Sequence, residues 1–399
     1  MIRSIHPFPA RMAPELAISS LKSLNTGSVV LDPMMGSGTV IREASRLGHT
    51  AIGFDFDPLA VLMSDVSTSI VDAAKVEQLV KKVLERCRQP RTQITLPWID
   101  QDDETQSFIN FWFAQPQRSH LRQIAEQLFR LEQSTQRYRI RTAINILKLS
   151  LSRIIITKNE GASLARDVSH SRPHKVAQKV DFDVFSAFTS SVRQILHQLS
   201  MTALNGTVTV QRGDARSLKD IRDCTIDLVL TSPPYLNAID YMRGHRLSLV
   251  WLGYRLSDLR LIRSNSIGAE RSLASTKQRI PTEIVRKAMG KIDALPDRQR
   301  AMIDRYSNDL LMMASEVRRV LKPDGKAVFV IGNSCIKGVY IRNSDALIKA
   351  ASLSGLRLTS KSERQLPSQN RYLPMPATSE APLGKRMRTE TILRFRLML

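Results

Sequence analysis

Short apolar runs rich in β-branched residues recur along the chain, and each is followed by turn-forming or acidic residues. Runs of this kind are typical of buried β-strands. They predict seven strands, at Ser28–Asp32, Thr50–Asp55, Thr207–Asp214, Ile226–Thr231, Lys326–Gly332, Leu356–Ser360 and Thr391–Arg396. Helical patterns lie between them, at Ser37–Leu47, Asp72–Arg88, Arg139–Ile156, Val184–Leu204 and Arg305–Leu321. Strands that alternate with helices indicate an α/β fold with a doubly wound, mostly parallel sheet.

Two stretches exceed what a minimal sheet of this class needs. We predict residues 1–66 as the first part of the sheet domain, 67–206 as a mainly helical insertion and 207–399 as the second part, with a further insertion at 241–304. The last two predicted strands are joined by a proline-rich stretch with no clear helix. We therefore expect them to form an antiparallel hairpin at one edge of the sheet.

Composition narrows the class of protein. The 399 residues are 42% hydrophobic, which excludes disorder throughout the chain. Lys and Arg number 59 against 37 Asp and Glu, a formal net charge of +22. This excess favours a polyanionic partner, most simply nucleic acid, although an anionic membrane surface and plain solubility stay open. No apolar run approaches the about 18–20 residues of a membrane span, and no signal-peptide pattern opens the chain, so we expect a cytoplasmic protein without a membrane partner.

The three cysteines have neither disulfide nor metal-ligand spacing, and the histidines lack companions suited to a metal. We therefore expect no metal site and a reducing compartment.

A glycine turn follows the first predicted strand, where Asp32 precedes Gly36 and Gly38 and a helix begins. Glycines allow a tight turn and a close approach to a ligand, and the helix N-terminus offers free N–H groups to an anion. Asp55 and Asp214 end the next two strands, so three acids face the crevice at the carboxyl edge of the sheet. A ligand with a ribose, an adenine amino group and a zwitterionic tail would suit them. An ordinary turn with solvated acids is the alternative.

The fourth predicted strand is followed by Ser232, Pro233, Pro234 and Tyr235. Consecutive prolines hold the backbone extended, and their carbonyls still accept hydrogen bonds. The Ser232 hydroxyl and the Pro233 carbonyl are therefore suited to the two hydrogens of an exocyclic amino group, and Tyr235 offers a stacking face for a base. A rigid turn without chemistry is the alternative.

Together, these two motifs resemble a known family. Asp32–Thr39 (DPMMGSGT) and Thr231–Tyr235 (TSPPY) are similar to the D-P-F-x-G-S-G-T and [D/N/S]-P-P-[Y/F/W] motifs of the amino-methyltransferases that methylate nucleic-acid bases with S-adenosylmethionine. The opening His6–Arg11 (HPFPAR) also resembles a segment that many bacterial DNA members carry. The match covers the sheet, roughly residues 5–65, 205–240 and 305–335. Met35 departs from the family pattern, which usually has Phe there.

The resemblance implies a Rossmann-like methyltransferase sheet of order 3-2-1-4-5-7-6, with the cofactor and target motifs side by side. It implies roles for two groups of residues. The S-adenosylmethionine site would comprise Phe8, Pro9, Asp32, Pro33, Gly36, Gly38, Thr39, Asp55, Asp57 and Asp214. The target base would be held by Ser232, Pro233, Pro234 and Tyr235.

The target atom follows in part from the motif. Methylation of cytosine C5 needs a Cys in a Pro-Cys loop, and none of the three cysteines follows a proline. Within the family, Ser at the first motif position favours cytosine N4 and Asp favours adenine N6. We therefore expect N4 methylation of cytosine in DNA, with adenine N6, guanine N2, an RNA base, or a catalytically silent nucleic-acid-binding protein as alternatives. The resemblance further implies a modification system and, with it, a cognate restriction endonuclease.

We expect duplex DNA to bind on the crevice side, with the target base flipped out of the stack. Residues 241–305 contain 14 Lys and Arg against 6 Asp and Glu, and residues 357–399 contain 9 against 3. These segments, including Arg364, Arg371 and Lys385, are candidates for phosphate contacts. The polar stretch Arg166–Lys175 and the insertion at 67–206 are candidates for target recognition.

Overall fold

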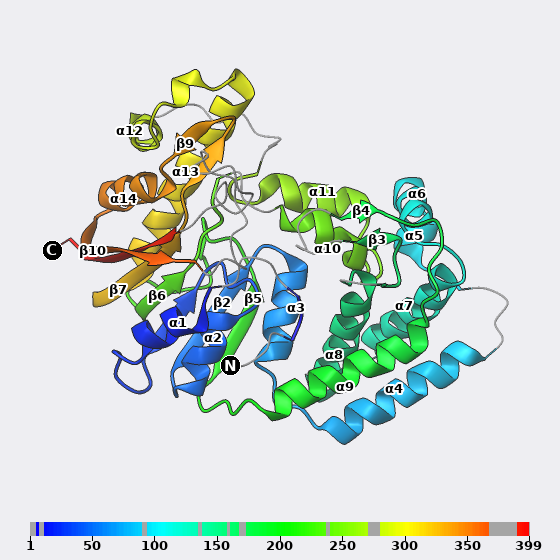
Figure 1. Cartoon of the computed structure of the whole chain (residues 1–399). Coiled ribbons are helices and arrows are strands. Elements are labelled where there is room, and N and C mark those ends of the chain that lie inside the picture. Colours follow the sequence, from blue (N-terminus) through cyan, green and yellow to red (C-terminus); the bar gives the residue numbers. More distant parts are fainter. Residues whose placement is uncertain are drawn as a thin grey trace.

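A seven-stranded sheet forms the centre of the computed structural model (Figure 1). The structure describes residues 5–7, 12–89, 94–134, 138–157, 160–166, 173–236, 240–269, 280–366 and 389–398. The strands of the sheet are β1 (Val29–Asp32), β2 (Thr50–Asp55), β5 (Val208–Arg212), β6 (Ile226–Thr231), β7 (Leu321–Ile331), β10 (Leu356–Gln365) and β11 (Thr389–Leu397). All seven predicted strands are thus present.

The order of the strands confirms the predicted topology. They lie in the order β10-β11-β7-β6-β1-β2-β5. When the seven are numbered along the chain and read from the β5 edge, this order is 3-2-1-4-5-7-6. The first five are parallel, whereas β11 is antiparallel to both β7 and β10, so the terminal hairpin lies at one edge. Because β1 has β2 on one side and β6 on the other, the chain reverses its direction of winding there, which is where α/β sheets bind ligands.

Both faces of the sheet are buried at its centre, where alternate residues of β1, β6 and β7 belong to different cores. In β6, Leu228 and Leu230 pack on one face and Val229 on the other. This period of two is what a strand covered by helices on both sides requires. The covering helices are α1 (Pro14–Leu21) and α2 (Thr39–Arg46) on the first face, and α13 (Asp297–Val320) and α14 (Asn343–Leu353) on the second.

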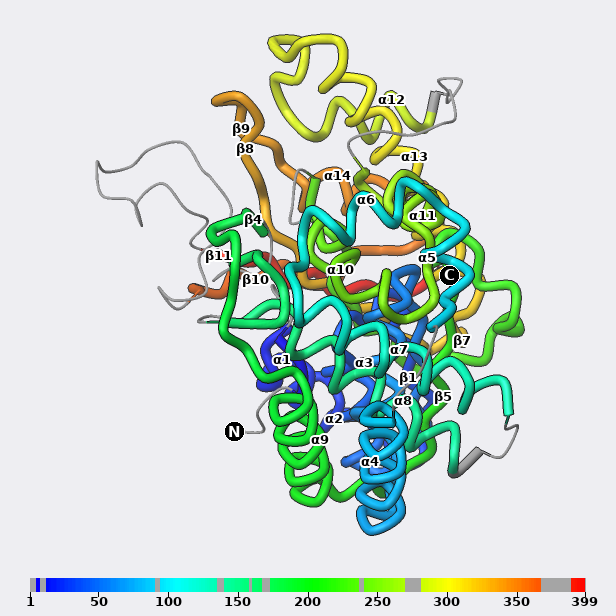
Figure 2. Tube along the Cα trace, turned by 90° about the vertical axis from the view of Figure 1, so that its right-hand side faces the viewer, coloured from blue at the N-terminus to red at the C-terminus, as the bar shows by residue number. Residues whose placement is uncertain are grey.

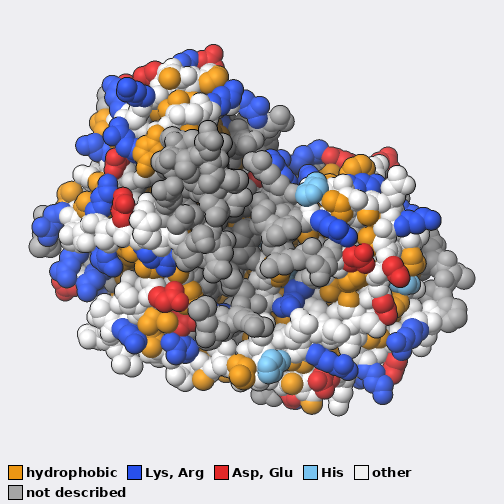
Figure 3. Space-filling model, in the orientation of Figure 1, with side chains coloured by type: hydrophobic (Ala, Val, Ile, Leu, Met, Phe, Trp, Pro, Cys, Tyr) orange, Lys and Arg blue, Asp and Glu red, His pale blue; other side chains and the backbone are white. Residues whose placement is uncertain are grey.

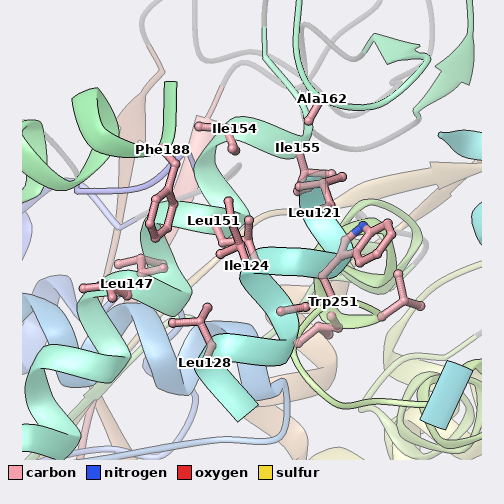
Figure 4. Packing of buried hydrophobic residues seen from close by; sticks show 14 of the residues in the cluster. Leu121, Ile124, Leu128, Leu147, Leu151, Ile154, Ile155, Ala162, Phe188 and Trp251 are labelled. Atoms are coloured by element: carbon pink, nitrogen blue, oxygen red, sulfur yellow. The ribbon is translucent and has the colours of Figure 1, made fainter. Parts of the chain in front are cut away.

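A block of helices lies beside the sheet, with α3 (Pro58–Ser67) between the two, and has its own core (Figures 1 and 4). Leu121, Ile124, Leu151, Phe188 and Trp251 are fully buried in it. The block comprises α4 (Ala73–Arg88), α5 (Pro97–Asp100), α6 (Asp103–Trp112), α7 (Gln117–Ser134), α8 (Tyr138–Ile155), the strand pair β3 (Ala165–Arg166) and β4 (His174–Lys175), and α9 (Val184–Ser200).

The start of the second insertion joins this helical block. Helices α10 (Tyr241–Leu249) and α11 (Leu256–Asn265) contribute to its core, and the Trp98 indole N–H donates to the Val250 carbonyl at 2.8 Å. The two insertions predicted from the sequence therefore pack on each other at this point.

The rest of the second insertion lies at the other end of the molecule. It forms α12 (Ile280–Ala288) and η1 (Ile292–Ala294), next to the hairpin of β8 (Ser334–Ile336) and β9 (Val339–Ile341) (Figure 2). Neither that hairpin nor α14 was among the elements predicted from the sequence. No helix among the described residues is both long and apolar enough to cross a membrane.

Candidate active site

A cavity of about 610 Å³ opens at the carboxyl edge of the sheet, where β1 and β6 lie side by side. Its volume is typical of a site for a small ligand. The glycine turn, the ends of β2 and β5, the Ser-Pro-Pro-Tyr loop and helices α10 and α11 line it. Eleven of the predicted site residues are among the lining: Asp32, Pro33, Gly36, Thr39, Asp55, Asp57, Asp214, Ser232, Pro233, Pro234 and Tyr235.

The glycine turn is fixed by contacts to β2 and α3. Gly36 and Gly38 have φ of 51° and 79°, the left-handed region that favours glycine. The Gly36 N–H donates to Asp55 Oδ2 at 2.8 Å, and the Ser64 hydroxyl donates to the Gly36 carbonyl at 2.9 Å. A Cβ on Gly38 would lie 2.7 Å from Ser64 Oγ. Gly38 is thus placed behind the turn, as the N-cap of α2, and supports the turn from there.

Asp32 joins the two motifs predicted from the sequence. Only 3% of the residue is exposed, and its Oδ1 accepts hydrogen bonds from the Thr231 hydroxyl at 2.6 Å and the Met34 N–H at 3.2 Å. Burial, helped by the charge of Asp55, raises the pKa of Asp32 to about 7. Because Thr231 directly precedes Ser232, one hydrogen bond connects the glycine turn to the Ser-Pro-Pro-Tyr loop.

Two further carboxylates lie at the end of β2. Asp55 accepts from the backbone N–H groups of Gly36 and Asp57, and burial and the charge of Asp57 raise its pKa to about 6. Asp57 caps α3 through the Leu59 N–H and pairs with Nδ1 of His245 at 2.5 Å. Burial alone would raise the pKa of Asp57, but the charge and hydrogen bond of His245 lower it.

His245 was not predicted as a site residue. It is a lone histidine on α10, 188 residues from Asp57 in the sequence, and no local pattern marks it. Tyr241, four residues earlier on the same helix, also lines the cavity, and burial together with the charges of Asp55 and Asp57 raises its pKa.

Asp214, beyond the end of β5, is held in an ion-pair network. Both its carboxylate oxygens accept from the guanidinium of Arg216. The same guanidinium donates to Asp309 at 2.7 Å and to the carbonyl of Asn265 at the end of α11. Arg216 thus neutralises Asp214 and ties α11 to the edge of the cavity. Sequence reasoning missed Arg216 because an Asp-Ala-Arg stretch is common in loops.

The Ser-Pro-Pro-Tyr loop is anchored to the strands and helices around it. The Ser232 hydroxyl donates to the Val330 carbonyl of β7 at 2.9 Å, and the Tyr306 hydroxyl of α13 donates to the Pro234 carbonyl at 3.0 Å. Since the proton of Ser232 points at Val330, the other side of its oxygen has only lone pairs, and Ser232 can act there as an acceptor.

The other residues predicted from the sequence either lie outside the described part of the chain or do not line the cavity. Phe8 and Pro9 lie outside the described residues, whereas Met12, a little further along, lines the cavity. Residues 167–172 of the Arg166–Lys175 stretch and residues 367–388, with Arg371 and Lys385, are also outside them. Among the described residues, no group of His, Cys, Asp and Glu is suited to hold a metal ion.

Several of the basic residues expected to contact phosphate are already paired with acids. Arg260 pairs with Glu104, and Arg263 and Arg243 both pair with Asp240. Other Lys and Arg side chains are spread over both halves of the face shown in Figure 3, intermixed with acidic ones. Part of the positive charge in the second insertion therefore joins the insertions to each other or fixes the rim of the cavity.

Known proteins resemble the chain over most of its length. Type II methyltransferase M.BsoBI of Geobacillus stearothermophilus is 23% identical over 378 residues, which cover 80% of this chain and 71% of that protein. Type II methyltransferase M.MvaI of Kocuria varians is 22% identical and covers 84% of this chain and 78% of its own. Type II methyltransferase M.MjaII of Methanocaldococcus jannaschii is 29% identical over 89 residues, 22% of this chain and 17% of its own. No family model matches the chain.

Solved structures similar to the chain include SAM-dependent methyltransferases. One from Methanosarcina mazei covers 98% of this chain and 99% of its own at 9% identity, with a TM-score of 0.34. A TehB-like one from Corynebacterium glutamicum covers 96% and 87% at 10% identity, with a TM-score of 0.30.

The sheet and the two motifs that meet in its cavity have the arrangement expected of a methyltransferase. More narrowly, the resemblance to the amino-methyltransferases is confirmed by the two type II methyltransferases that match most of the chain.

Proposed function

We propose that the chain transfers a methyl group from S-adenosylmethionine to the N4 amino group of cytosine in DNA, as the modification enzyme of a type II system. One observation carries this proposal: the glycine turn and the Ser-Pro-Pro-Tyr loop line a single cavity and are joined by the hydrogen bond from Thr231 to Asp32. The type II methyltransferases that match most of the chain support it.

The donor groups around the cavity fit the proposed cofactor. When bound, S-adenosylmethionine supplies a methyl group activated by a sulfonium. The pKa values of the Asp32 and Asp55 carboxyls are raised by burial and by the charge of a neighbouring acid, so ionising them in the free protein is costly. A ligand with an ammonium and a sulfonium would offset that cost. We assign Asp32 and Gly36 to its methionine part, Asp55 and Asp57 to the ribose side, and Asp214 to the adenine.

We assign the target amino group to Ser232 and to the carbonyl of Pro233. Both are acceptors, so they can take the two amino hydrogens, draw the nitrogen away from the plane of the ring and free its lone pair for attack. No general base has to act first, because the amine loses its proton after the methyl group arrives. The residues therefore orient the nitrogen instead of deprotonating it.

The choice of DNA and of cytosine rests on the motif and the relatives. Ser at position 232 favours cytosine N4 in the family, and the relatives are type II methyltransferases. A base within a duplex cannot enter a recessed cavity, so the target base has to be flipped out. We assign sequence recognition to the insertions at 67–206 and 241–304, and we infer a cognate restriction endonuclease as the cellular counterpart.

The test is the modified-base content of a cell that expresses the chain. Genomic DNA is digested to nucleosides and analysed by mass spectrometry, with the Ser232→Ala variant as the matched control. We expect N4-methylcytosine with the wild type and about a hundredfold less with the variant. Detection of N6-methyladenine instead would change only the base that we assign as the target. Detection of no new methylated deoxynucleoside would contradict the proposal.

A further inference from the structure

The hydroxyl of Tyr235 has a partner that no sequence motif marks. It donates a hydrogen bond to Oε1 of Glu390 at 3.1 Å, across a sequence distance of 155 residues. Glu390 is the second residue of β11, so the contact joins the Ser-Pro-Pro-Tyr loop to the antiparallel hairpin at the edge of the sheet. Both side chains are almost completely buried, with 6% of each residue exposed.

Glu390 is itself held in place by the sheet. It lies directly opposite Arg364 of β10, and its Oε2 is 3.5 Å from the Arg364 guanidinium. The next residue, Thr391, pairs with Ile331 of β7. A carboxylate that is fixed by two neighbouring strands is a rigid acceptor for the tyrosine hydroxyl.

This carboxylate lies close to the cavity without lining it. Tyr235 is among the described residues of the cavity wall, and Glu390 is not. Burial raises the pKa of Glu390, which means that the protein bears a cost for keeping an acid there. The charge of Arg364 and the hydrogen bond from Tyr235 act in the opposite direction and favour the ionised form, which is the stronger acceptor.

We propose that Glu390 is a positioning residue for base methylation, because its hydrogen bond to the Tyr235 hydroxyl fixes the position of the ring against which the target base stacks. The inference rests on the proposed function. The hydroxyl oxygen lies on the axis of the second side-chain torsion, so the hydrogen bond holds the first torsion of Tyr235 in one rotamer. Because a phenolic O–H prefers to lie in the plane of its ring, the fixed direction of the bond to Glu390 also restrains rotation of the ring about that axis. The base, and with it the amino nitrogen, takes its position from that ring, and transfer requires the nitrogen in line with the methyl group.

A double-mutant cycle on the methylation of duplex DNA tests this inference. The variants are Glu390→Leu, which removes the acceptor, Tyr235→Phe, which removes the donor, and the two combined. Glu390→Gln keeps an acceptor oxygen at the same place. Glu363→Leu, an exposed glutamate on the neighbouring strand, is the matched control. For each variant, kcat and KM for DNA are measured under single- and multiple-turnover conditions, and the cofactor Kd is measured by calorimetry.

We expect Glu390→Leu and Tyr235→Phe each to lower kcat about tenfold with the cofactor Kd changed less than about twofold. The combined variant should lose no more than either one, because the two residues act through one hydrogen bond. Glu390→Gln should recover most of the loss, and Glu363→Leu should match the wild type.

Losses that multiply in the combined variant, or a Glu390→Leu variant with normal kcat, would overturn the role of Glu390 and leave the proposed function intact. Equal losses of kcat and of cofactor affinity would also overturn it, since they would point to a general disturbance of the sheet edge. A wild type that methylates no DNA would refute the proposed function and this inference together.

Discussion

Thr231 and Asp32 lie 199 residues apart in the sequence, yet the hydroxyl of the first donates to the carboxylate of the second at 2.6 Å. Both residues end parallel strands, β6 and β1, that are neighbours in the sheet. The hydrogen bond therefore links, at the ends of the two strands, the part of the cavity assigned to the cofactor with the loop assigned to the target base.

Replacing Thr231 by Val keeps the shape of the side chain and removes this donor. Asp32 would lose one of its two hydrogen bonds inside the protein, which costs about 1–3 kcal/mol. The two motifs would also lose the side-chain contact that joins them. We expect kcat/KM for methyl transfer to fall about tenfold to a hundredfold. Thr209→Val, on the exposed side of β5, is the control and should leave kcat/KM unchanged.

The buried Asp32 predicts an unusual pH dependence of stability. Its pKa is 3.8 in the unfolded chain and about 7 in the folded one, so the folded state binds this proton more tightly. The contribution to stability is fully present below pH 4 and is lost as the pH rises to 7. Asp32→Asn removes the titrating group, and its free energy of unfolding at pH 8 should exceed that of the wild type by up to about 4 kcal/mol.

Urea unfolding at several pH values between 4 and 8 measures this difference, with Asp324→Asn, at an exposed position of β7, as the control. Parallel curves for wild type and Asp32→Asn would contradict the assignment of a buried, uncompensated carboxylate. The extra stability of the variant should come with a loss of methyl transfer, as is common when a functional site stores unfavourable interactions.

Asp55 predicts how cofactor binding depends on pH. Its pKa is about 6 in the free protein, and the donors and cations of the proposed cofactor favour the ionised form. Protons therefore compete with the cofactor below about pH 6, and the Kd of the cofactor should rise as the pH falls through that value. Asp55→Asn should weaken binding about tenfold at pH 8 and flatten the profile around pH 6, while the contribution of Asp32 near pH 7 remains. Calorimetric titrations from pH 5 to 8 measure both effects, and a variant with the wild-type profile would exclude Asp55 from the cofactor site.

Gly38 and Gly27 form a matched pair for the glycine turn. Both have φ near 80°, so alanine at either position costs about 1–2 kcal/mol through the backbone alone. At Gly38 the added Cβ would also lie 2.7 Å from Ser64 Oγ, whereas Gly27 has no atom within 4 Å of that position. Gly38→Ala should therefore lose more stability than Gly27→Ala. Cofactor binding should weaken in Gly38→Ala and stay unchanged in Gly27→Ala. Thermal unfolding and calorimetry compare the two, and equal effects would refute a supporting role of Gly38.

The fold was largely predictable because the strands carry their signal locally. In a strand buried on both sides nearly every residue is apolar, and such runs ended at the observed boundaries for β2 and β6. The predicted bounds were wrong where a helix or strand extends into polar sequence. Helix α13 begins at Asp297 rather than Arg305, and β7 includes the polar turn at Lys322–Gly325, which loops out of the pairing with β6.

The site was predictable only where it is contiguous in sequence. The two motifs could be read because their residues follow one another. His245, Arg216 and Glu390 contact Asp57, Asp214 and Tyr235 through hydrogen bonds that only the folded chain creates. A lone charged residue on a helix or strand carries no pattern, and its partner cannot be inferred until the topology brings the two together.

The most direct test of the account uses the purified chain with methyl-labelled S-adenosylmethionine and separate pools of duplex DNA and RNA. Label is followed into individual nucleosides by mass spectrometry, after calorimetry has established that the cofactor binds. We expect label in DNA, as N4-methylcytosine, and none in RNA. Label in RNA alone, or none in either pool despite cofactor binding, would contradict it.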